Sequence, residues 1–221
     1  MTEHRSHLEL FRNLEALART GLHFCKDEYD RERYDQIERI TAELIAAEAT
    51  RTAAELHPGA PGLDAEALLA EWLRESGYIT PKIEVRGAVF RPHDGKVLLV
   101  RETADGRWTL PGGWADVNDS PSLAITREIE QEAGFRTRAM KLAALYDRNA
   151  HGHTPSVHHS WKAFFLCDIV GGEARGSYET DAVDFFDVHA LPPMSIGRCT
   201  PQQVERMRQH WLQPEMSTDF D

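Results

Sequence analysis

The chain has no apolar run long enough to cross a membrane. Its longest apolar runs, such as Val97–Val100 and Ala163–Cys167, are only a few residues long, whereas a spanning helix needs about 20. Residues 1–17 show helical periodicity and several charges in place of the apolar centre of a signal peptide. We therefore expect a protein with neither a membrane span nor a secretory leader.

Cysteine and positive charge are also scarce. Cys25, Cys167 and Cys199 are odd in number and widely spaced, which argues against a disulfide framework and predicts reduced thiols in the cytoplasm. Lys and Arg number 25 against 36 Asp and Glu, so the formal net charge is -11. This balance disfavours a stable nucleic-acid partner. It is compatible with a small phosphorylated substrate that arrives with its own metal.

The first part of the chain, residues 1–78, has a helical pattern and is expected to form a separate domain. The whole chain has 221 residues and 41% hydrophobic content, which allow it one or two cores. The pattern predicts one helix that ends at Gly21, a second that extends through residues 46–54 to a break at 57–62, and a third from 63 or 64 to Gly77. The expected buried stripes are Leu8, Phe11, Leu14 and Leu17 in the first helix, and Tyr34, Ile37, Ile40, Leu44 and Ile45 in the second. Three such helices make a small helical domain or a dimerisation element.

From Pro81 the periodicity changes to that of strands, which predicts a second domain over residues 79–221. Residues 83–90 read as a strand, and Asp94-Gly95 as the hairpin turn into a strand over 96–100. Further strands are expected at 108–110, 136–147, 160–170 and 183–187, and a last helix at 200–211. The predicted class is α+β.

Residues 113–135 form a glycine loop followed by a helix with acidic side chains. Gly112 and Gly113 allow positive φ and close approach to a ligand. Ser120 is suited to the N-cap, Pro121 to the first helical position and Gly134 to the residue that ends the helix.

Three polar side chains share one face of this helix. At about 100° per residue, Glu128, Gln131 and Glu132 lie within an arc of roughly 100°, beside an apolar stripe, while Glu130 lies on the far side. Mg²⁺ prefers oxygen ligands and keeps several waters. The pattern therefore predicts a divalent-metal site for pyrophosphate chemistry. An ordinary amphipathic surface helix would not explain the preceding loop.

This segment resembles the Nudix box, which runs Gly, five residues, Glu, seven residues, Arg-Glu, apolar, any, Glu-Glu, any, Gly, apolar. The matching positions are Gly113, Arg127, Glu128, Ile129, Glu132, Gly134 and Phe135. The resemblance implies an α/β/α sandwich with a mixed sheet, and a hydrolase that uses Mg²⁺ or Mn²⁺. It makes Gly113, Asp119, Arg127 and Gly134 the structural positions of the box.

Two positions depart from the box. Asp119 replaces the first Glu and is expected to keep the pairing with Arg127 that the family uses to orient the helix. Gln131 replaces the first Glu of the Glu-Glu pair. The resemblance implies that Glu128, Gln131, Glu132 and a backbone carbonyl near Gly112 or Gly113 hold the metal. Because glutamine offers an oxygen but no charge, we expect weaker metal affinity and reduced activity.

Residues outside the box narrow the resemblance to Nudix hydrolases of nucleoside diphosphates linked to a moiety X. The segments that carry it are 20–22, 29–34, 81–82, 111–117, 147–148, 151–153 and 162–167. This group includes CDP-choline and ADP-ribose pyrophosphatases, which are typically homodimers. It implies hydrolysis to a nucleoside monophosphate and phosphoryl-X, with CDP-choline as the preferred substrate and ADP-ribose next.

Further site residues are hypotheses. The family has one more acid in a late loop, as ligand or base, and Glu179 is the candidate, although a solvated turn acid fits equally well. Arg86, Arg101 and Arg148 are candidates for phosphate contacts, and His153 or His159 for a contact to the base. The alternative for each arginine is an ordinary surface residue. The histidines at 151, 153, 158 and 159 match no zinc spacing.

Two other functions remain open. Gln131 is compatible with a nonenzymatic Nudix module that binds a nucleotide or a partner, although retention of Glu128 and Glu132 favours activity. A hydrolase that trims RNA ends or sanitises the nucleotide pool would use the same chemistry, because the box recognises the pyrophosphate and not the base.

Overall fold

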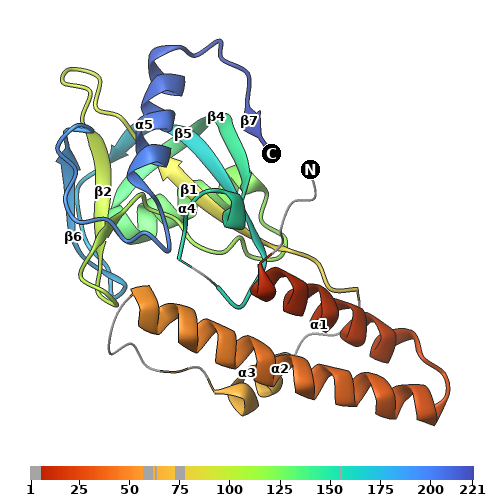
Figure 1. Ribbon diagram of the computed structural model, residues 1–221. Helices are drawn as coiled ribbons and strands as arrows, with labels where there is room; N and C mark the ends of the chain where they lie inside the picture. The colour runs from red at the N-terminus through yellow and green to blue at the C-terminus, as the bar shows by residue number, and fades with distance from the viewer. Residues whose placement is uncertain (1–5, 57–61, 63, 73–77, 155) are drawn as a thin grey trace. The chain divides into compact units, whose positions relative to one another are not determined.

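The computed structural model describes residues 6–56, 62, 64–72, 78–154 and 156–221 (Figure 1). The chain divides into two compact units. The helical unit comprises Met1–Pro81 with Thr154–His159, and the sheet unit comprises Lys82–His153 with Ser160–Asp221. The predicted α+β class, a helical region followed by a mixed sheet between helices, is confirmed. No helix among the described residues is long and apolar enough to cross a membrane.

The helical unit contains α1 (His7–Phe24), α2 (Glu28–Leu56) and α3 (Ala65–Trp72). Helix α1 begins at a capping box in which Ser6 and Glu9 satisfy each other's backbone N–H groups. The predicted end at Gly21 is wrong, because α1 continues to Phe24. A Cβ at Gly21 would lie 2.5 Å from the Tyr34 ring, so this glycine allows α2 to pack closely. The predicted break at 57–62 and the predicted end at Gly77 lie largely outside the described residues.

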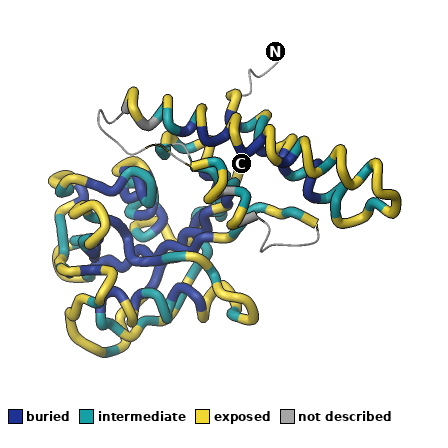
Figure 2. Tube along the Cα trace, turned by 90° about the horizontal axis from the view of Figure 1, so that it is seen from below, coloured by how far each residue is buried: buried dark blue, intermediate teal, exposed yellow. Residues whose placement is uncertain are grey.

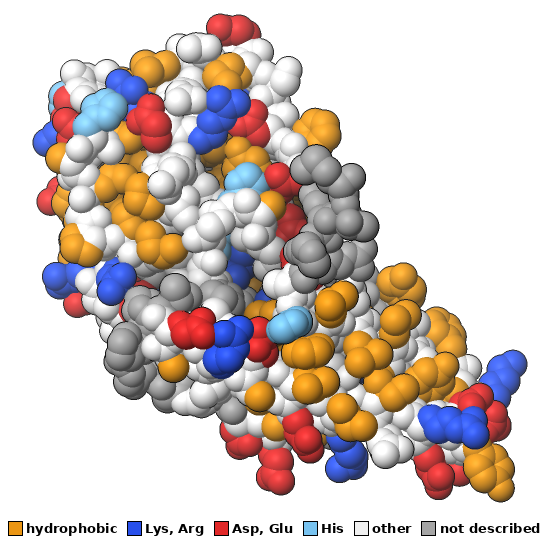
Figure 3. Space-filling model, in the orientation of Figure 1, with side chains coloured by type: hydrophobic (Ala, Val, Ile, Leu, Met, Phe, Trp, Pro, Cys, Tyr) orange, Lys and Arg blue, Asp and Glu red, His pale blue; other side chains and the backbone are white. Residues whose placement is uncertain are grey.

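The predicted apolar stripes of α1 and α2 are only partly buried. Leu8 and Ile45 are buried, but Leu14, Leu17 and Ile40 are 39%, 68% and 47% exposed. Figure 3 shows apolar side chains gathered over α1 and α2. Periodicity identifies a stripe on a helix, but it does not tell whether the stripe packs within the chain or elsewhere.

Charged side chains occupy some of the buried positions of α1 and α2. Arg19 pairs with Glu15 at 2.8 Å and with Glu38 at 3.7 Å, and all three residues are buried. Burial raises the pKa of Glu38, against the charge of Arg19. The helical unit therefore buries ion pairs while it leaves leucine and isoleucine side chains exposed.

The sheet unit contains seven strands in two sheets, with a helix on each side. The strands are β1 (Lys82–Ala88), β2 (Val97–Glu102), β3 (Trp108–Thr109), β4 (Phe135–Asp147), β5 (Ser160–Gly172), β6 (Thr180–Phe186) and β7 (Asp219–Phe220). The helices are α4 (Pro121–Ala133) and α5 (Pro201–Leu212), and a short 3-10 turn spans Arg148–Ala150. One sheet has the order β1-β5-β4-β7 and the other β3-β2-β6. Parallel pairing of β1 with β5 and antiparallel pairing of β4 with β5 make the first sheet mixed.

Two apolar cores lie on opposite faces of the sheets. Ile125 and Ile129 of α4 pack in a cluster with Leu98 of β2, whereas Met207 of α5 packs in a second cluster with Leu99. Successive residues of β2 thus face different helices, as the alternation of a strand requires. Figure 2 shows buried residues concentrated in the strands of this unit. The sheets therefore lie in the middle layer of an α/β/α sandwich.

The predicted hairpin turn is present, and one short strand was missed. The Asp94-Gly95 turn is present, with Gly95 at φ 68°, and the N–H of Leu98 donates to the carbonyl of Val89 at 2.9 Å. This turn joins Phe90 and Val97 in an antiparallel bridge, so the predicted hairpin turn is confirmed, whereas β1 itself pairs with β5 and the rest of β2 with β3 and β6. Alternation marks a strand but does not identify its partner. Strand β7 was not predicted, because its two residues are too short for a periodic signal.

Candidate active site

The loop before α4 is fixed against the edge of β1. The N–H of Val85 donates to the carbonyl of Gly113 at 2.8 Å, and the N–H of Gly87 donates to the carbonyl of Pro111 at 2.9 Å. Gly112 has a φ of 142°, and a Cβ there would lie 2.1 Å from the carbonyl oxygen of Val85. Only glycine can therefore occupy position 112 without moving the loop.

Helix α4 begins and ends as its sequence predicts. Ser120 is the N-cap and accepts from the N–H of Leu123, Pro121 opens the helix, and Gly134 ends it at φ 77° in the left-handed region. The expected pair of Arg127 and Asp119 is present, with Nη1 2.9 Å from Oδ2. Arg127 also pairs with Asp116. These ion pairs connect the helix to the loop before it.

Glu132 points from α4 back into the glycine loop. It is buried, and its carboxylate accepts a hydrogen bond of 2.8 Å from the N–H of Gly112. Burial raises the pKa of Glu132 to about 7. The charge of Arg86 lowers this pKa, whereas the charges of Glu102 and Glu128 raise it. Glu132 therefore changes protonation near neutral pH.

Glu128 lies one helical turn earlier and contacts the same loop. A Cβ at Gly113 would lie 3.0 Å from Oε2 of Glu128, so the absence of a side chain at Gly113 makes room for this carboxylate. Burial also raises the pKa of Glu128. Two carboxylates from one helix thus face two glycines of one loop.

The structure brings Glu179 to the same region. Glu179 is exposed, in a turn where the N–H of Thr103 donates to its carbonyl at 2.8 Å. The next residue, Thr180, donates from its hydroxyl to the carbonyl of Glu132 at 2.6 Å. Burial raises the pKa of Glu128, and the charges of Arg86 and Arg127 lower it. The charge of Glu179 is a further cause that raises it. Glu179 therefore lies close to the α4 carboxylates.

Sequence reasoning missed a further acid, Glu102, at the end of β2. Glu102 is buried, lies opposite Thr180 in the pairing of β2 with β6, and forms an ion pair of 3.0 Å with Arg198. The strand register shifts between Arg101 and Glu102. A signal was present, because alternation puts Glu102 on the same face as Leu98 and Val100, which pack with α4. The partner Arg198 could not be found from local sequence.

Each of the three candidate arginines has partners within the protein. Arg86 is buried and is bonded to Glu84 at 2.8 Å and to the carbonyl of Leu110 at 3.0 Å. Arg101 pairs with Asp181 at 2.7 Å. Arg148 is buried and donates to the carbonyl of Gly197 at 3.4 Å. Each guanidinium is thus already engaged by groups of the protein.

His153 is held on both sides of its ring. Nδ1 donates to the carbonyl of Ile196 at 2.7 Å, and Nε2 accepts from the side-chain amide of Gln203 at 2.9 Å. Burial lowers the pKa of His153 to about 4. This single neutral tautomer leaves neither ring nitrogen available for a nucleotide base. His151 pairs with Asp221 at 2.9 Å and stacks on Tyr146.

Comparison with known proteins identifies the family. A model of the Nudix domain matches residues 80–206, which is more than half of the chain. The chain belongs to the Nudix family. A second model, described as the UDP-X-like, N-terminal oligomerisation domain, matches residues 5–59.

Two of three similar proteins cover nearly all of this Nudix hydrolase. A Bacillus subtilis protein provisionally named an ADP-ribose pyrophosphatase is 37% identical over 97% of this chain and 96% of its own. The crystal structure of a UDP-X diphosphatase is 29% identical, with a TM-score of 0.60 and 97% of each chain covered. That of an ADP-ribose pyrophosphatase from Streptococcus suis is 35% identical, with a TM-score of 0.59, over 64% of this chain and all of its own.

The Nudix box of this chain offers two carboxylates where the family pattern has three. Gln131 is exposed on α4. Within residues 6–56, 62, 64–72, 78–154 and 156–221, no three His, Cys, Asp or Glu side chains are arranged to hold a metal ion. Glu128 and Glu132 nevertheless fit a divalent cation, because both carboxylates face the glycine loop and offer the oxygen ligands that such a cation prefers.

Proposed function

We propose that this Nudix hydrolase uses Mg²⁺ or Mn²⁺ to cleave the diphosphate bridge of a nucleoside diphosphate linked to X, giving a nucleoside monophosphate and phosphoryl-X. The observation that carries the proposal is the buried Glu132 carboxylate, bonded to the N–H of Gly112 beside Glu128. The names of the relatives support ADP-ribose as a substrate. CDP-choline, which the sequence resemblance favours, belongs to the same chemical class and is the second candidate.

The cation would be held by Glu128, Glu132, the side-chain oxygen of Gln131 and a backbone carbonyl of Gly112 or Gly113. When bound, a divalent ion neutralises phosphate oxygens and lowers the pKa of the attacking water. The carbonyl of Gly113 already accepts a hydrogen bond from the N–H of Val85, so a cation would share that oxygen with Val85. Asp119, Arg127 and Gly134 hold the loop and helix in register around these ligands.

Proton transfer is assigned to the carboxylates around α4. Glu132, whose carboxylate faces the loop at Gly112 beside Glu128, is the first candidate to accept the proton of the attacking water. Glu128 shares the negative charge of this site. Glu179, on the turn that Thr180 ties to α4, is the second candidate for the base.

The proposed function is tested by phosphatase-coupled release of phosphate from ADP-ribose, CDP-choline, NADH, nucleoside diphosphate sugars and nucleoside triphosphates, with and without Mg²⁺ or Mn²⁺. We expect metal-dependent turnover of ADP-ribose or CDP-choline. Turnover of triphosphates alone would instead indicate a nucleotide-sanitising hydrolase. Absence of turnover on the whole panel would contradict a hydrolytic role for the natural protein.

Gln131→Glu is expected to tighten Mn²⁺ binding at least about fivefold, because one more charge about 4 Å from a cation is worth about 1 kcal/mol even in water. Turnover at limiting metal should rise with it. The measurement is a Mn²⁺ titration followed by electron paramagnetic resonance, together with rates at low Mn²⁺. Glu130→Gln is the control on the same helix, because Glu130 is exposed on the opposite side. Unchanged Mn²⁺ affinity in Gln131→Glu would show that position 131 does not face the metal.

The exposed Gln131 supports a second candidate, a Nudix module that binds a nucleotide without hydrolysing it. That function predicts ADP-ribose binding without turnover in the natural protein, and turnover that appears only in Gln131→Glu. The same two proteins therefore distinguish a weakened enzyme from a binding module.

We also propose that residues 1–78 and 79–221 are the two domains, and that the first assembles the protein into a homodimer. The description of the matching N-terminal model supports this assembly. The exposed apolar side chains of α1 and α2, among them Leu14, Leu17 and Ile40, supply a surface for it. Buried ion pairs on the other side of the helices leave this apolar surface available to a second copy.

Leu17→Glu and Ile40→Glu are each expected to convert the dimer to a monomer, because a carboxylate would be buried without a partner in the interface. The dissociation constant should rise at least about a hundredfold, from a penalty of about 3 kcal/mol. Size exclusion with light scattering measures the change. Arg31→Gln, on the opposite side of α2, changes the net charge equally and should remain dimeric. A monomeric natural protein, or dimeric variants, would contradict this surface.

A further inference from the structure

The loop before α5, residues 195–200, is held in place by basic side chains from elsewhere in the sheet unit. We call it the arginine loop, because it carries Arg198. Its first residue, Ser195, donates its N–H to the carbonyl of Trp108 at 2.8 Å. Each of the next three carbonyls accepts from a different basic side chain: Ile196 from His153 at 2.7 Å, Gly197 from Arg148 at 3.4 Å, and Arg198 from Lys162 at 2.8 Å.

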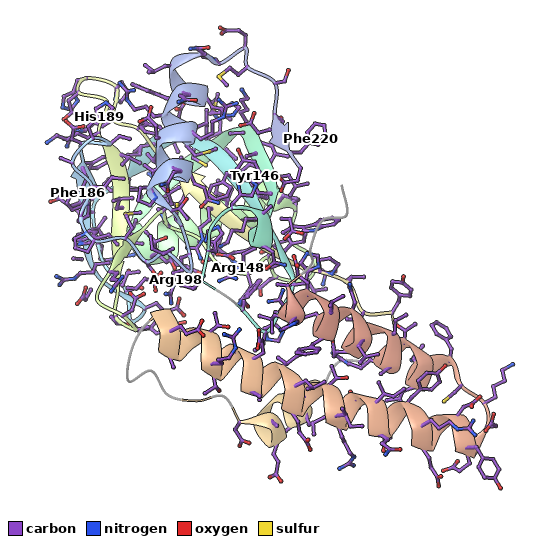
Figure 4. The ribbon with its side chains drawn as sticks, in the orientation of Figure 1. Tyr146, Arg148, Phe186, His189, Arg198 and Phe220 are labelled. Carbon is purple, nitrogen blue, oxygen red and sulfur yellow. The ribbon has the colours of Figure 1, made fainter. Side chains whose placement is uncertain are left out.

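These donors make the arginine loop a rigid element. Lys162 is fully buried at 0% exposure and Arg148 at 7%. A buried cation is costly unless it is paired, so three basic donors directed at three successive carbonyls fix the backbone closely. Figure 4 labels Arg148 and Arg198, and the hydrogen bond from Arg148 to Gly197 joins their segments. The position of the Arg198 side chain is therefore determined by the fold.

The Arg198 guanidinium is oriented by contacts at two of its three nitrogens. Nε lies 3.0 Å from the Glu102 carboxylate, and Nη1 lies 3.4 Å from Asp105 and 3.1 Å from the hydroxyl of Ser195. No partner of Nη2 is found among the described residues. The side chain is 32% exposed. Arg198 is thus held firmly and still has hydrogen-bond donors facing outward.

Arg198 lies next to the acids of the candidate active site. Its partner Glu102 is paired across the strands with Thr180. The hydroxyl of Thr180 donates to the carbonyl of Glu132 at 2.6 Å. One residue earlier is Glu179. The loop therefore brings a second cation, besides Arg86, to the edge of a site that is rich in carboxylates.

A diphosphate needs positive charge from the protein in such a site. The guanidinium of Arg86 is bonded to Glu84 and to a backbone carbonyl. The guanidinium of Arg127 forms ion pairs with Asp116 and Asp119. Arg198 combines a fixed position, proximity to the acids and unused donors. The guanidinium edge matches phosphate oxygens in geometry and charge.

We propose that Arg198 is a substrate-binding residue whose Nη2 group contacts a phosphate oxygen of the nucleoside diphosphate, while Glu102 and Asp105 orient it. This inference rests on the proposed function. Because Arg198 recognises the diphosphate that all substrates of the class share, its contribution is the same for ADP-ribose and CDP-choline.

The test compares KM and kcat of the full-length natural protein and its variants for ADP-ribose and for CDP-choline. Arg198→Gln is expected to raise KM about ten- to a hundredfold for whichever of the two is hydrolysed, as expected for loss of a charged hydrogen bond, with a smaller change in kcat. Arg198→Lys should recover part of this loss. Arg208→Gln is the matched control, because Arg208 is 30% exposed and pairs with Glu205 at 3.7 Å on α5.

Glu102→Gln separates a contact to substrate from an effect through Glu102. If Arg198 contacts the substrate, Glu102→Gln raises KM much less than Arg198→Gln does. The double variant, Glu102→Gln with Arg198→Gln, then keeps the large rise in KM without an unpaired buried carboxylate that could unfold it. Equal effects of the two single variants, or an unchanged KM in Arg198→Gln, would overturn the inference. A natural protein that hydrolyses no nucleoside diphosphate linked to X would instead overturn the proposed function.

Discussion

Glu132→Gln is expected to reduce turnover about 10²- to 10⁴-fold, as for loss of a general base, and at the same time to stabilise the metal-free protein at pH 8. Glutamine can still accept the hydrogen bond from the N–H of Gly112. It removes the negative charge that Glu132 carries in a site where only 4% of the residue is exposed. The residue that serves the reaction is therefore a residue that destabilises the fold.

The pH dependence of this stabilisation follows from the direction of the pKa shift. Burial raises the pKa of Glu132 from 4.5 to about 7. Below pH 4.5 the carboxyl is protonated in the folded and unfolded chains alike, so it does not affect their difference. As the pH rises to 7 the unfolded chain ionises first, and the natural protein loses up to about 3 kcal/mol at about 1.4 kcal/mol per unit. Glutamine does not ionise, so the variant keeps this stability.

Thermal unfolding in EDTA measures the effect. At pH 8 the melting temperature of Glu132→Gln should exceed that of the natural protein by about 6–12 °C, and near pH 4 the two should coincide. Mn²⁺ should then stabilise the natural protein more than the variant. Glu130→Gln, an exposed change on the same helix, should behave as the natural protein does. A lower melting temperature for Glu132→Gln at pH 8 would mean that a cation of the protein already compensates this carboxylate.

Glu84→Gln is expected to destabilise the sheet unit by about 3 kcal/mol, and to lower its melting temperature by about 6–12 °C. Glu84 is the buried carboxylate between two buried cations: it accepts from Lys162 at 2.5 Å and from Nε of Arg86 at 2.8 Å. Removing its charge leaves both cations without their counter-ion. Burial already lowers the pKa of Lys162 to about 8, and the variant should lower it further.

The effect of Glu84→Gln should disappear in acid. Burial alone would raise the pKa of Glu84, but the charges of Arg86 and Lys162 outweigh it and hold the pKa at about 2, below the ordinary 4.5. The stabilisation is therefore complete above pH 4.5 and is lost as the pH falls through 2. Urea unfolding at several pH values measures the difference, with the exposed Glu173→Gln as the control. A constant difference between pH 7 and pH 3 would show that the carboxylate charge is not what stabilises the fold.

Local signals predicted the loop and helix of the Nudix box well. Ser120, Pro121 and Gly134 each act through their own backbone geometry or that of a neighbouring turn, so their roles can be read from a short segment. The pairing of Arg127 with Asp119 spans two turns of one helix and its cap. Such features depend little on the rest of the fold.

Features that depend on distant segments could not be predicted. The ion pair of Glu102 with Arg198 joins the end of β2 to a loop far along the chain. Arg86 looked available for phosphate, but Glu84 on the same strand face and the carbonyl of Leu110 surround it. The stripe through Leu17 was recognised as apolar, but no local signal told that it would stay exposed. Tertiary partners decided each of these cases.

One side chain, Gln203, joins the start of α5 to the arginine loop. Its oxygen accepts from the N–H of Thr200 at 3.0 Å, and its amide nitrogen donates to His153 at 2.9 Å, while His153 donates to Ile196. Because one amide group makes both contacts, the number of residues between Ile196 and Thr200 is fixed. Inserting or deleting a residue there would break either the helix cap or the histidine contact. Natural variation in this part of the chain should accordingly occur as substitution of residues and not as change of length.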